Sequence, residues 1–301
     1  MINILSWKHF MSSYLKKNYY LCKSKYYKLT KVVMSNNKVL YISQEITPYL
    51  PSSPMAVLGQ KIPQGIQESK FEVRTFMPKY GCINERRNQL HEVIRLSGMN
   101  LIIDDTDHPL IIKVATLQPA RMQIYFIDND DYFQHHVATD LEIKQYPEDN
   151  DERIMFYVRG VVETVKKLRW EPTVVHCSGW ISALAPIYLK RIYNEDPSFR
   201  SAKVAYALYD ETFEGNLNER FFEKMKMDGF SEEDLEIINN KSVDFVTLNK
   251  LAIKYADGII QASPTINEEL VEYAKSLGKP FMEYPGEENY IEAYAQFYQS
   301  L

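Results

Sequence analysis

The chain has little cysteine and no long hydrophobic run. Its three cysteines, Cys22, Cys82 and Cys177, are too few and too scattered for a disulfide framework or a zinc site, so we expect a reducing, cytoplasmic location. The absence of any run of 18 apolar residues argues against a membrane span. Internal repeats and low-complexity tracts are also absent, and 45% hydrophobic with 25% charged residues is typical of a globular protein.

Acidic residues are absent from residues 1–33, which contain seven lysines. Because the whole chain has a net charge of −5, subtracting these seven positive charges leaves −12 for the remainder. We interpret residues 1–33 first as a basic, poorly ordered extension, with translation starting at Met34. The alternatives are a basic interaction tail and an organelle-targeting peptide. The acidic remainder disfavours nucleic acid as a partner.

Alternating strand and helix patterns predict a doubly wound α/β domain. Strands are expected at 38–43, 71–76, 173–176, 203–209 and 259–262. A helical pattern between the first two strands forms a βαβ unit, which favours a mainly parallel sheet in one Rossmann-like domain over residues 35–285. Two alternating runs, 110–117 and 122–127, predict an inserted β-hairpin.

Apolar stripes and capping signals predict the helices. Helices are expected at 55–66, 149–168, 181–192 and 243–256, with a closing helix at 288–301. Ser231 and Asp234 form a capping-box pattern before a short acidic helix. Ser263 followed by Pro264 predicts the start of another helix, which ends at Gly278.

The segment from Pro172 to Lys190 carries the most informative motif. It reads PTVVHCSGWISALAPIYLK, a buried strand, a turn and a helix, which is the unit whose loop binds ligands in α/β folds. It resembles the segment V-V-H-x-H-D-W-H-T-A-L-x-P-x-Y-L of bacterial glycogen and plant starch synthases, glycosyltransferase family 5. The matching residues are His176, Trp180, Ala183, Leu184, Pro186, Tyr188 and Leu189.

Four further segments resemble the same family in the same order. They read KVLYISQEITPY, EVRTFMPKYG, IYFID and NKLAIKYADGIIQASPTINEEL. The resemblance implies the N-terminal half of a type B glycosyltransferase, whose members have two Rossmann domains. The closing helix at 288–301 resembles the one that crosses back onto the first domain in such enzymes. We therefore expect a chain without the donor-binding domain.

The chain departs from the family where the family carries its polar groups. Leu50–Met55 replaces the K-T-G-G-L loop, and its prolines remove amide donors, so this loop is a poor anion cradle. Ser178, Gly179 and Ile181 stand where the motif has His, Asp and His. In the segment that matches T-I-H-N-x-x-Y-Q-G, Tyr209 replaces the histidine.

The candidate site lies at the carboxyl edge of the predicted sheet. Candidate substrate-binding residues are Glu45, Trp180, Tyr209, Asp210 and Gly215. His176 is the candidate catalytic residue, and the alternative is a histidine that only bonds the turn. Trp180 either stacks on a sugar or packs in the core, and Glu45 either contacts a ligand or caps a helix. Asp210, with Glu211 and Glu214, forms either an acidic pocket or a solvated loop.

No metal or cofactor is expected. His135 and His136 are adjacent, but no third ligand has suitable spacing. Cys177 follows His176 directly in a strand, so their side chains point to opposite faces and cannot form a nucleophile pair.

The resemblance implies the ADP-glucose:α-1,4-glucan glucosyltransferase family, and the departures predict a chain that is inactive by itself. The alternative is a non-catalytic glucan-binding or regulatory module that docks onto a glucan-metabolising enzyme. Expected partners are an α-glucan or maltooligosaccharide, a nucleotide sugar only with a partner domain, and a protein partner. Neither nucleic acid nor a membrane is expected.

Overall fold

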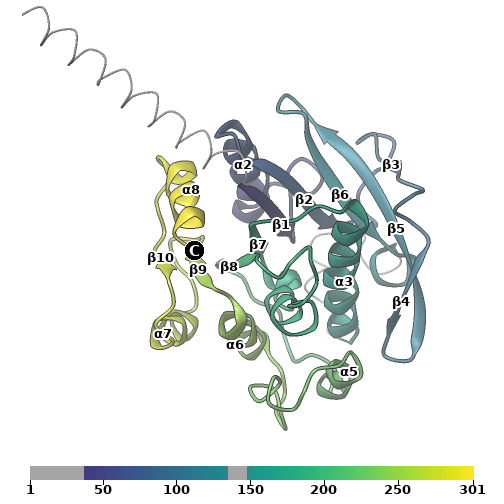
Figure 1. The fold of residues 1–301 in the computed structure, drawn as a ribbon, viewed down its shortest axis with the longest axis vertical. Helices are drawn as coiled ribbons and strands as arrows, with labels where there is room; N and C mark the ends of the chain where they lie inside the picture. The colour runs from purple at the N-terminus through teal and green to yellow at the C-terminus, as the bar shows by residue number, and fades with distance from the viewer. Residues whose placement is uncertain (1–36, 135–147) are drawn as a thin grey trace, which may run out of the picture. The chain divides into compact units, whose positions relative to one another are not determined.

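A ten-stranded β-sheet organises the part of the chain that the structure, a computed structural model, describes, residues 37–134 and 148–301 (Figure 1). The strands are β1 (Lys38–Ser43), β2 (Glu72–Pro78), β3 (His91–Glu92), β4 (Met99–Ile103), β5 (Thr106–Leu117), β6 (Met122–Asp128), β7 (Val174–Ser178), β8 (Lys203–Leu208), β9 (Gly258–Gln261) and β10 (Phe281–Met282). Their order across the sheet is β10-β9-β8-β7-β1-β2-β6-β5-β3, and β4 pairs with β5. The expectations for residues 1–33, His135 and His136 lie outside the described residues.

The sheet is parallel from β10 to β6 and antiparallel beyond. This confirms the predicted doubly wound, mainly parallel sheet and the β5–β6 hairpin. Sequence analysis missed β3, β4 and β10. Two of these have only two residues each, too short for any alternation to be recognised, and β4 carries its pattern over only five.

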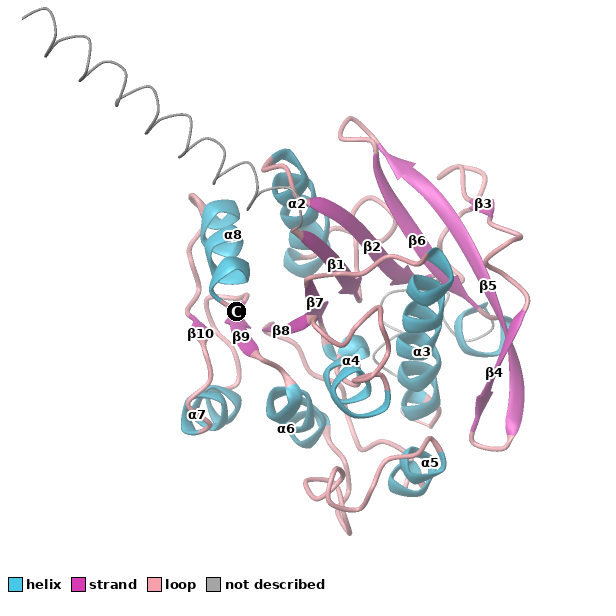
Figure 2. Ribbon diagram, in the orientation of Figure 1, coloured by secondary structure: helices cyan, strands magenta, loops and turns pink. Residues whose placement is uncertain are grey.

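Helices cover both faces of the parallel strands. They are α2 (Pro54–Glu68), α3 (Asn150–Leu168), α4 (Ala185–Ile187), α5 (Phe221–Met227), α6 (Phe245–Tyr255), α7 (Glu268–Ser276) and α8 (Tyr290–Ser300). Figure 2 shows α2 and α8 on one side of the sheet and α3, α4 and α6 on the other. Among the described residues, no helix has both the length and the apolar character needed to cross a membrane.

Strand residues alternate between two apolar clusters. In β1, Val39 and Tyr41 pack in the cluster that contains residues of α2 and α8, whereas Leu40 and Ile42 pack in the cluster that contains residues of α3 and α6. This is the period of two expected for a strand that is buried on both faces.

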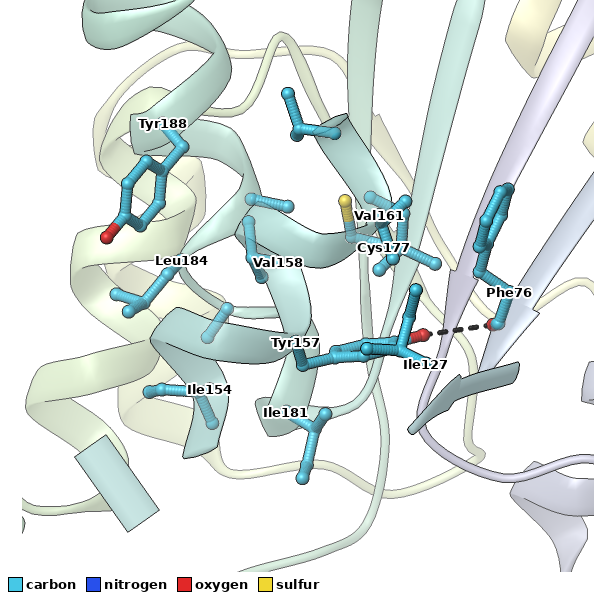
Figure 3. Packing of buried hydrophobic residues seen from close by; sticks show 14 of the residues in the cluster. Phe76, Ile127, Ile154, Tyr157, Val158, Val161, Cys177, Ile181, Leu184 and Tyr188 are labelled. Carbon is cyan, nitrogen blue, oxygen red and sulfur yellow. Dashed lines mark hydrogen bonds between the residues drawn. The ribbon is translucent and has the colours of Figure 1, made fainter. Parts of the chain in front are cut away.

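The larger cluster holds a tyrosine that joins two strand ends. Tyr157 of α3 is fully buried, and Figure 3 shows its hydroxyl directed towards Phe76, with Ile127 beside the ring. Its hydroxyl lies 2.9 Å from the carbonyl oxygen of Ser43 and 3.0 Å from that of Phe76. The carboxyl ends of β1 and β2 are therefore fixed relative to α3, which positions the loops that follow them.

The prediction of one regular α-helix over 181–192 is wrong. The segment consists of a 3₁₀ turn at Trp180–Ser182, the short α4 and a π turn at Tyr188–Ile192. Pro186 has no N–H to donate to the preceding turn, which disfavours a regular α-helix through this position.

Two predicted helix starts also differ. Ser231 and Asp234 make both capping-box hydrogen bonds, at 3.1 Å each, but only turns follow. The Ser263-Pro264 start is wrong, because α7 begins at Glu268 and is capped by Asn267. The Ser263 hydroxyl is used elsewhere, as the acceptor for the Asp210 N–H at 3.1 Å.

Close packing fixes α8 against the sheet and α2. A Cβ atom on Gly258 of β9 would lie 2.5 Å from Leu301 Cδ2, and one on Gly65 of α2 would lie 2.7 Å from Ile291 Cδ1. Because glycine has no Cβ, the helix can lie directly on both elements.

Candidate functional site

The topological switch point of the sheet lies between β1 and β7. From β1 the chain passes through α2 to β2 on one side, whereas α3 leads to β7 on the other side. In open α/β sheets, ligands bind outside the carboxyl ends of the two strands at such a point. Because β7 and β8 are also neighbours, the structure brings together the loops after β1, β7 and β8, as the sequence predicted.

Gln44 fills this switch point. Its side chain is fully buried, and its amide oxygen accepts a hydrogen bond from the Ile181 N–H at 3.3 Å. The amide nitrogen donates to a Glu211 carboxylate oxygen at 3.0 Å. The other Glu211 oxygen accepts from the Trp180 N–H at 3.0 Å. One amide and one carboxylate therefore tie the three loops together, in the place where related folds hold a ligand.

Gly179 makes this closure sterically feasible. Its φ is +81°, in the left-handed region that favours glycine. A Cβ atom here would lie 2.5 Å from the Gln44 Oε1 atom. The aspartate that the family motif has at this position would therefore require the buried Gln44 side chain to shift.

Glu45 takes part in capping α2. One of its carboxylate oxygens accepts from the Ser53 hydroxyl at 2.6 Å, and that hydroxyl oxygen accepts from the Ala56 N–H at 2.9 Å. Pro54, the first residue of the helix, has no N–H. The segment that replaces the K-T-G-G-L motif thus presents a capped helix end beside a carboxylate. Its contact with a ligand stays a prediction.

His176 lies inside the protein, with both ring nitrogens paired. It is 1% exposed, and its Nδ1 lies 3.0 Å from the Tyr298 hydroxyl of α8. Its Nε2 lies 2.9 Å from the Ser178 hydroxyl. The rings of Tyr41 and Tyr294 pack around it. Burial lowers the pKa of His176 to about 3, so the ring is neutral at physiological pH. Its catalytic role stays a prediction.

Trp180 and Tyr188 are core residues in this structure. Trp180 is fully buried, its ring packs on Phe213 at 5.0 Å between centroids, and its indole N–H has no partner among the described residues. The Tyr188 hydroxyl donates to Asp228. Stacking of Trp180 on a sugar would require the ring to leave the core.

Of the candidate residues in the loop after β8, one is buried and two are exposed. Tyr209 is buried, and its hydroxyl lies 3.5 Å from the Ser178 hydroxyl. Asp210 is exposed, and its carboxylate accepts from the Thr265 hydroxyl at 3.2 Å. Gly215 is exposed with a φ of +76°, which the turn requires. Asp210 and Gly215 are therefore the predicted residues that a ligand can reach without rearrangement.

A cavity of about 530 Å³ lies beside this edge, and none of the predicted site residues lines it. It is lined by Ser52, Ser53, Pro54, Val57, Leu58, Lys61, Ala262, Ser263, Pro264, Tyr284, Pro285, Gly286, Glu287, Tyr290 and Tyr294. Sequence analysis missed Tyr290 and Tyr294, as well as Gln44 and Tyr298. The four-residue spacing of the three tyrosines in α8, which places them on one helix face, was the available signal. Within residues 37–134 and 148–301, no group of three or more His, Cys, Asp or Glu is arranged to hold a metal ion.

Comparison with known proteins identifies the family. The model of the starch synthase catalytic domain matches residues 38–281. The glycogen synthase of Chlorobium phaeovibrioides is 33% identical over 236 residues, which are 78% of this chain and 47% of the relative. That of Chlorobium chlorochromatii is 35% identical over 194 residues, 64% of this chain and 40% of the relative. The solved catalytic domain of starch synthase IV from Arabidopsis thaliana, bound to ADP and acarbose, matches with a TM-score of 0.65 and 17% identity, over 83% of this chain and 51% of that one.

The chain therefore belongs to the starch synthase catalytic domain family. The resemblance inferred from the five sequence segments is confirmed, and the solved structure shares the fold. The chain spans about half the length of the curated relatives it matches.

Replacing Gly179 tests how tightly Gln44 closes the switch point. We expect Gly179→Ala to lower the free energy of unfolding by about 3 kcal/mol, through backbone strain and a clash with buried Gln44. Gly278→Ala is the matched control, since Gly278 also has a positive φ (+64°) but open space around it; its cost should be about 1 kcal/mol. Urea unfolding measures both. Equal losses would mean that the contact with Gln44 imposes no constraint.

The buried His176 should make stability depend on pH. The unfolded ring has a pKa near 6.5 and the folded ring about 3, so between these values the unfolded state binds more protons and stability falls as pH drops. From pH 7 to pH 5 this contributes a loss of about 2 kcal/mol. The loss should be smaller by that amount in His176→Gln and unchanged in His91→Gln, which alters an exposed histidine. Unfolding at the two pH values measures it, and parallel profiles for wild type and His176→Gln would contradict a neutral buried ring.

Proposed function

We propose that this chain is a glucan-binding domain of the glycogen and starch synthase type that transfers no glucose from ADP-glucose when assayed by itself. Its role would lie in glycogen biosynthesis, where it holds an α-1,4-glucan while a second polypeptide supplies the donor-binding half. The three scattered cysteines support a reducing, cytoplasmic location.

The observation that carries this proposal is the pair of hydrogen bonds that links Glu45, Ser53 and Ala56 at the start of α2. The Ser53 hydroxyl already caps the helix and donates to the Glu45 carboxylate, and Pro54 supplies no amide. A diphosphate at this position would meet a negative charge and few free donors. Stabilising a leaving diphosphate requires the opposite arrangement, with cations or amide groups directed at its oxygens.

The charges of the surrounding loops support the same proposal. Residues 44–54, 178–182 and 209–215 contain no lysine or arginine, whereas Glu45, Asp210 and Glu211 lie among them. Carboxylates and hydroxyls suit the hydroxyl groups of a neutral sugar. These loops therefore favour a glucan over a nucleotide sugar as the ligand of this domain.

The alternative function is a regulatory module that docks onto a glucan-metabolising enzyme. The closed switch point favours it over an independent transferase, because Gln44 and Glu211 occupy the place where a ligand would react. Both functions require glucan binding or a protein partner, and neither requires transfer by the chain itself.

Calorimetric titration with separate ligands tests the proposal. Maltoheptaose should bind with a dissociation constant of about a millimolar, because an open edge covers only part of a sugar chain. ADP-glucose and ADP should release no heat of binding. Radiolabelled glucose from ADP-glucose should not enter glycogen above the level without protein. Tight binding of ADP-glucose, or transfer by the purified chain, would refute the proposal.

A further inference from the structure

The 530 Å³ cavity beside the sheet edge has the features of a binding site for a neutral ring. It is formed by the first turns of α2, the Ser263-Pro264 turn after β9, and residues 284–290, which lead into α8. Figure 1 shows α2 and α8 together on one face of the sheet. The volume lies within the range of small-molecule sites, roughly 300–1,000 Å³.

The lining combines flat aromatic surface with few charges. Tyr284 and Tyr290 are half-buried, and Val57 and Leu58 add an apolar wall. Lys61 and Glu287 balance each other in charge, and neither forms an ion pair with another residue of the described segments. Balanced charge and exposed ring faces suit an uncharged ligand that has both apolar C–H faces and hydroxyl groups.

Tyr294 is the most deeply buried of the three tyrosines in the lining. It lines the cavity, is 1% exposed, and its hydroxyl has no hydrogen-bond partner among the described residues. Because this oxygen has less than 1 Å² of accessible surface, it is enclosed by the protein and a ligand in the cavity does not reach it. Tyr298, one turn further along α8, is by contrast paired with His176.

We infer that this cavity binds the end of an α-1,4-glucan, with a glucosyl ring stacked on Tyr290. This rests on the proposed function and adds the place where the glucan is held. The cavity adjoins the candidate site on two sides, because Ser53 bonds Glu45 and Ser263 bonds the Asp210 N–H. A glucan end in the cavity therefore leaves the rest of its chain free to run along the exposed Asp210 loop.

Methyl NMR with maltotriose as the probe locates the site directly. In full-length protein with labelled Val and Leu methyl groups, maltotriose should shift the signals of Val57 and Leu58. The methyl groups of Leu217 and Val243, which line a separate cavity of about 470 Å³, should not move. Adenosine is titrated in parallel, because a purine also stacks on tyrosine.

Two variants measure the contacts by calorimetry. Tyr290→Ala should weaken maltotriose binding about tenfold by removing the stacking surface, with Tyr273→Ala, a partly buried tyrosine of α7, as the matched control. Tyr294→Phe should leave maltotriose binding unchanged, because the hydroxyl that it removes is enclosed by the protein. Its urea midpoint should be unchanged or higher, because the hydroxyl is unpaired. Tyr206→Phe, which removes a bond to Asn249 in the other apolar cluster, should lower the midpoint and leave affinity unchanged.

Each outcome decides the inference. If maltotriose binds wild type and Tyr290→Ala equally, the glucan lies elsewhere, and the proposed function stands while this site is rejected. If wild type binds no maltooligosaccharide at tens of millimolar, about the weakest affinity a small site gives, the proposed function and this site both fail. If adenosine shifts Val57 and Leu58 and maltotriose does not, the cavity is a nucleoside site and the inference is wrong.

Discussion

The hydrogen bond between Gln44 and Glu211 is the interaction on which the ligand-binding edge depends. It joins the loops after β1 and β8, and the backbone amides of Trp180 and Ile181 connect both side chains to the loop after β7. All of these groups lie at the switch point, so the protein satisfies its own polar groups in the place where related folds satisfy those of a ligand. A buried network with every member paired is rigid, and it disfavours opening.

The polar groups of His176, which tyrosines surround, are likewise paired within the protein. His176 keeps the strand position that the family motif gives it, but the rings of Tyr294 and Tyr298 from α8 and of Tyr41 from β1 pack around it. A neutral imidazole between two hydroxyls stabilises the packing of α8 on the sheet. The same helix leaves a cavity at its first turn, so the ligand-accessible space lies beside the switch point.

The sequence was sufficient for the fold because each long strand and helix carries a sustained apolar pattern, as in β1 and α3. It was insufficient where the outcome depends on partners distant in sequence. Gln44 follows a strand without any motif, and its role depends on Glu211, 167 residues away. Ser263 has the pattern of an N-cap, but the Asp210 N–H competes for its hydroxyl. The sequence showed that Ser178 and Gly179 replace polar motif residues. It did not show that the Gln44 side chain fills the space beside them.

Amide hydrogen exchange at Trp180 and Ile181 tests the central claim, that the protein's own side chains close the switch point. Both amides donate to side chains of other loops, the half-buried Glu211 and the fully buried Gln44, so they should exchange as slowly as the core strands, with opening free energies near that of global unfolding. Adding ADP-glucose should leave both rates unchanged. Exchange of these two amides as fast as that of exposed loops, or protection that appears only with ADP-glucose, would contradict the account.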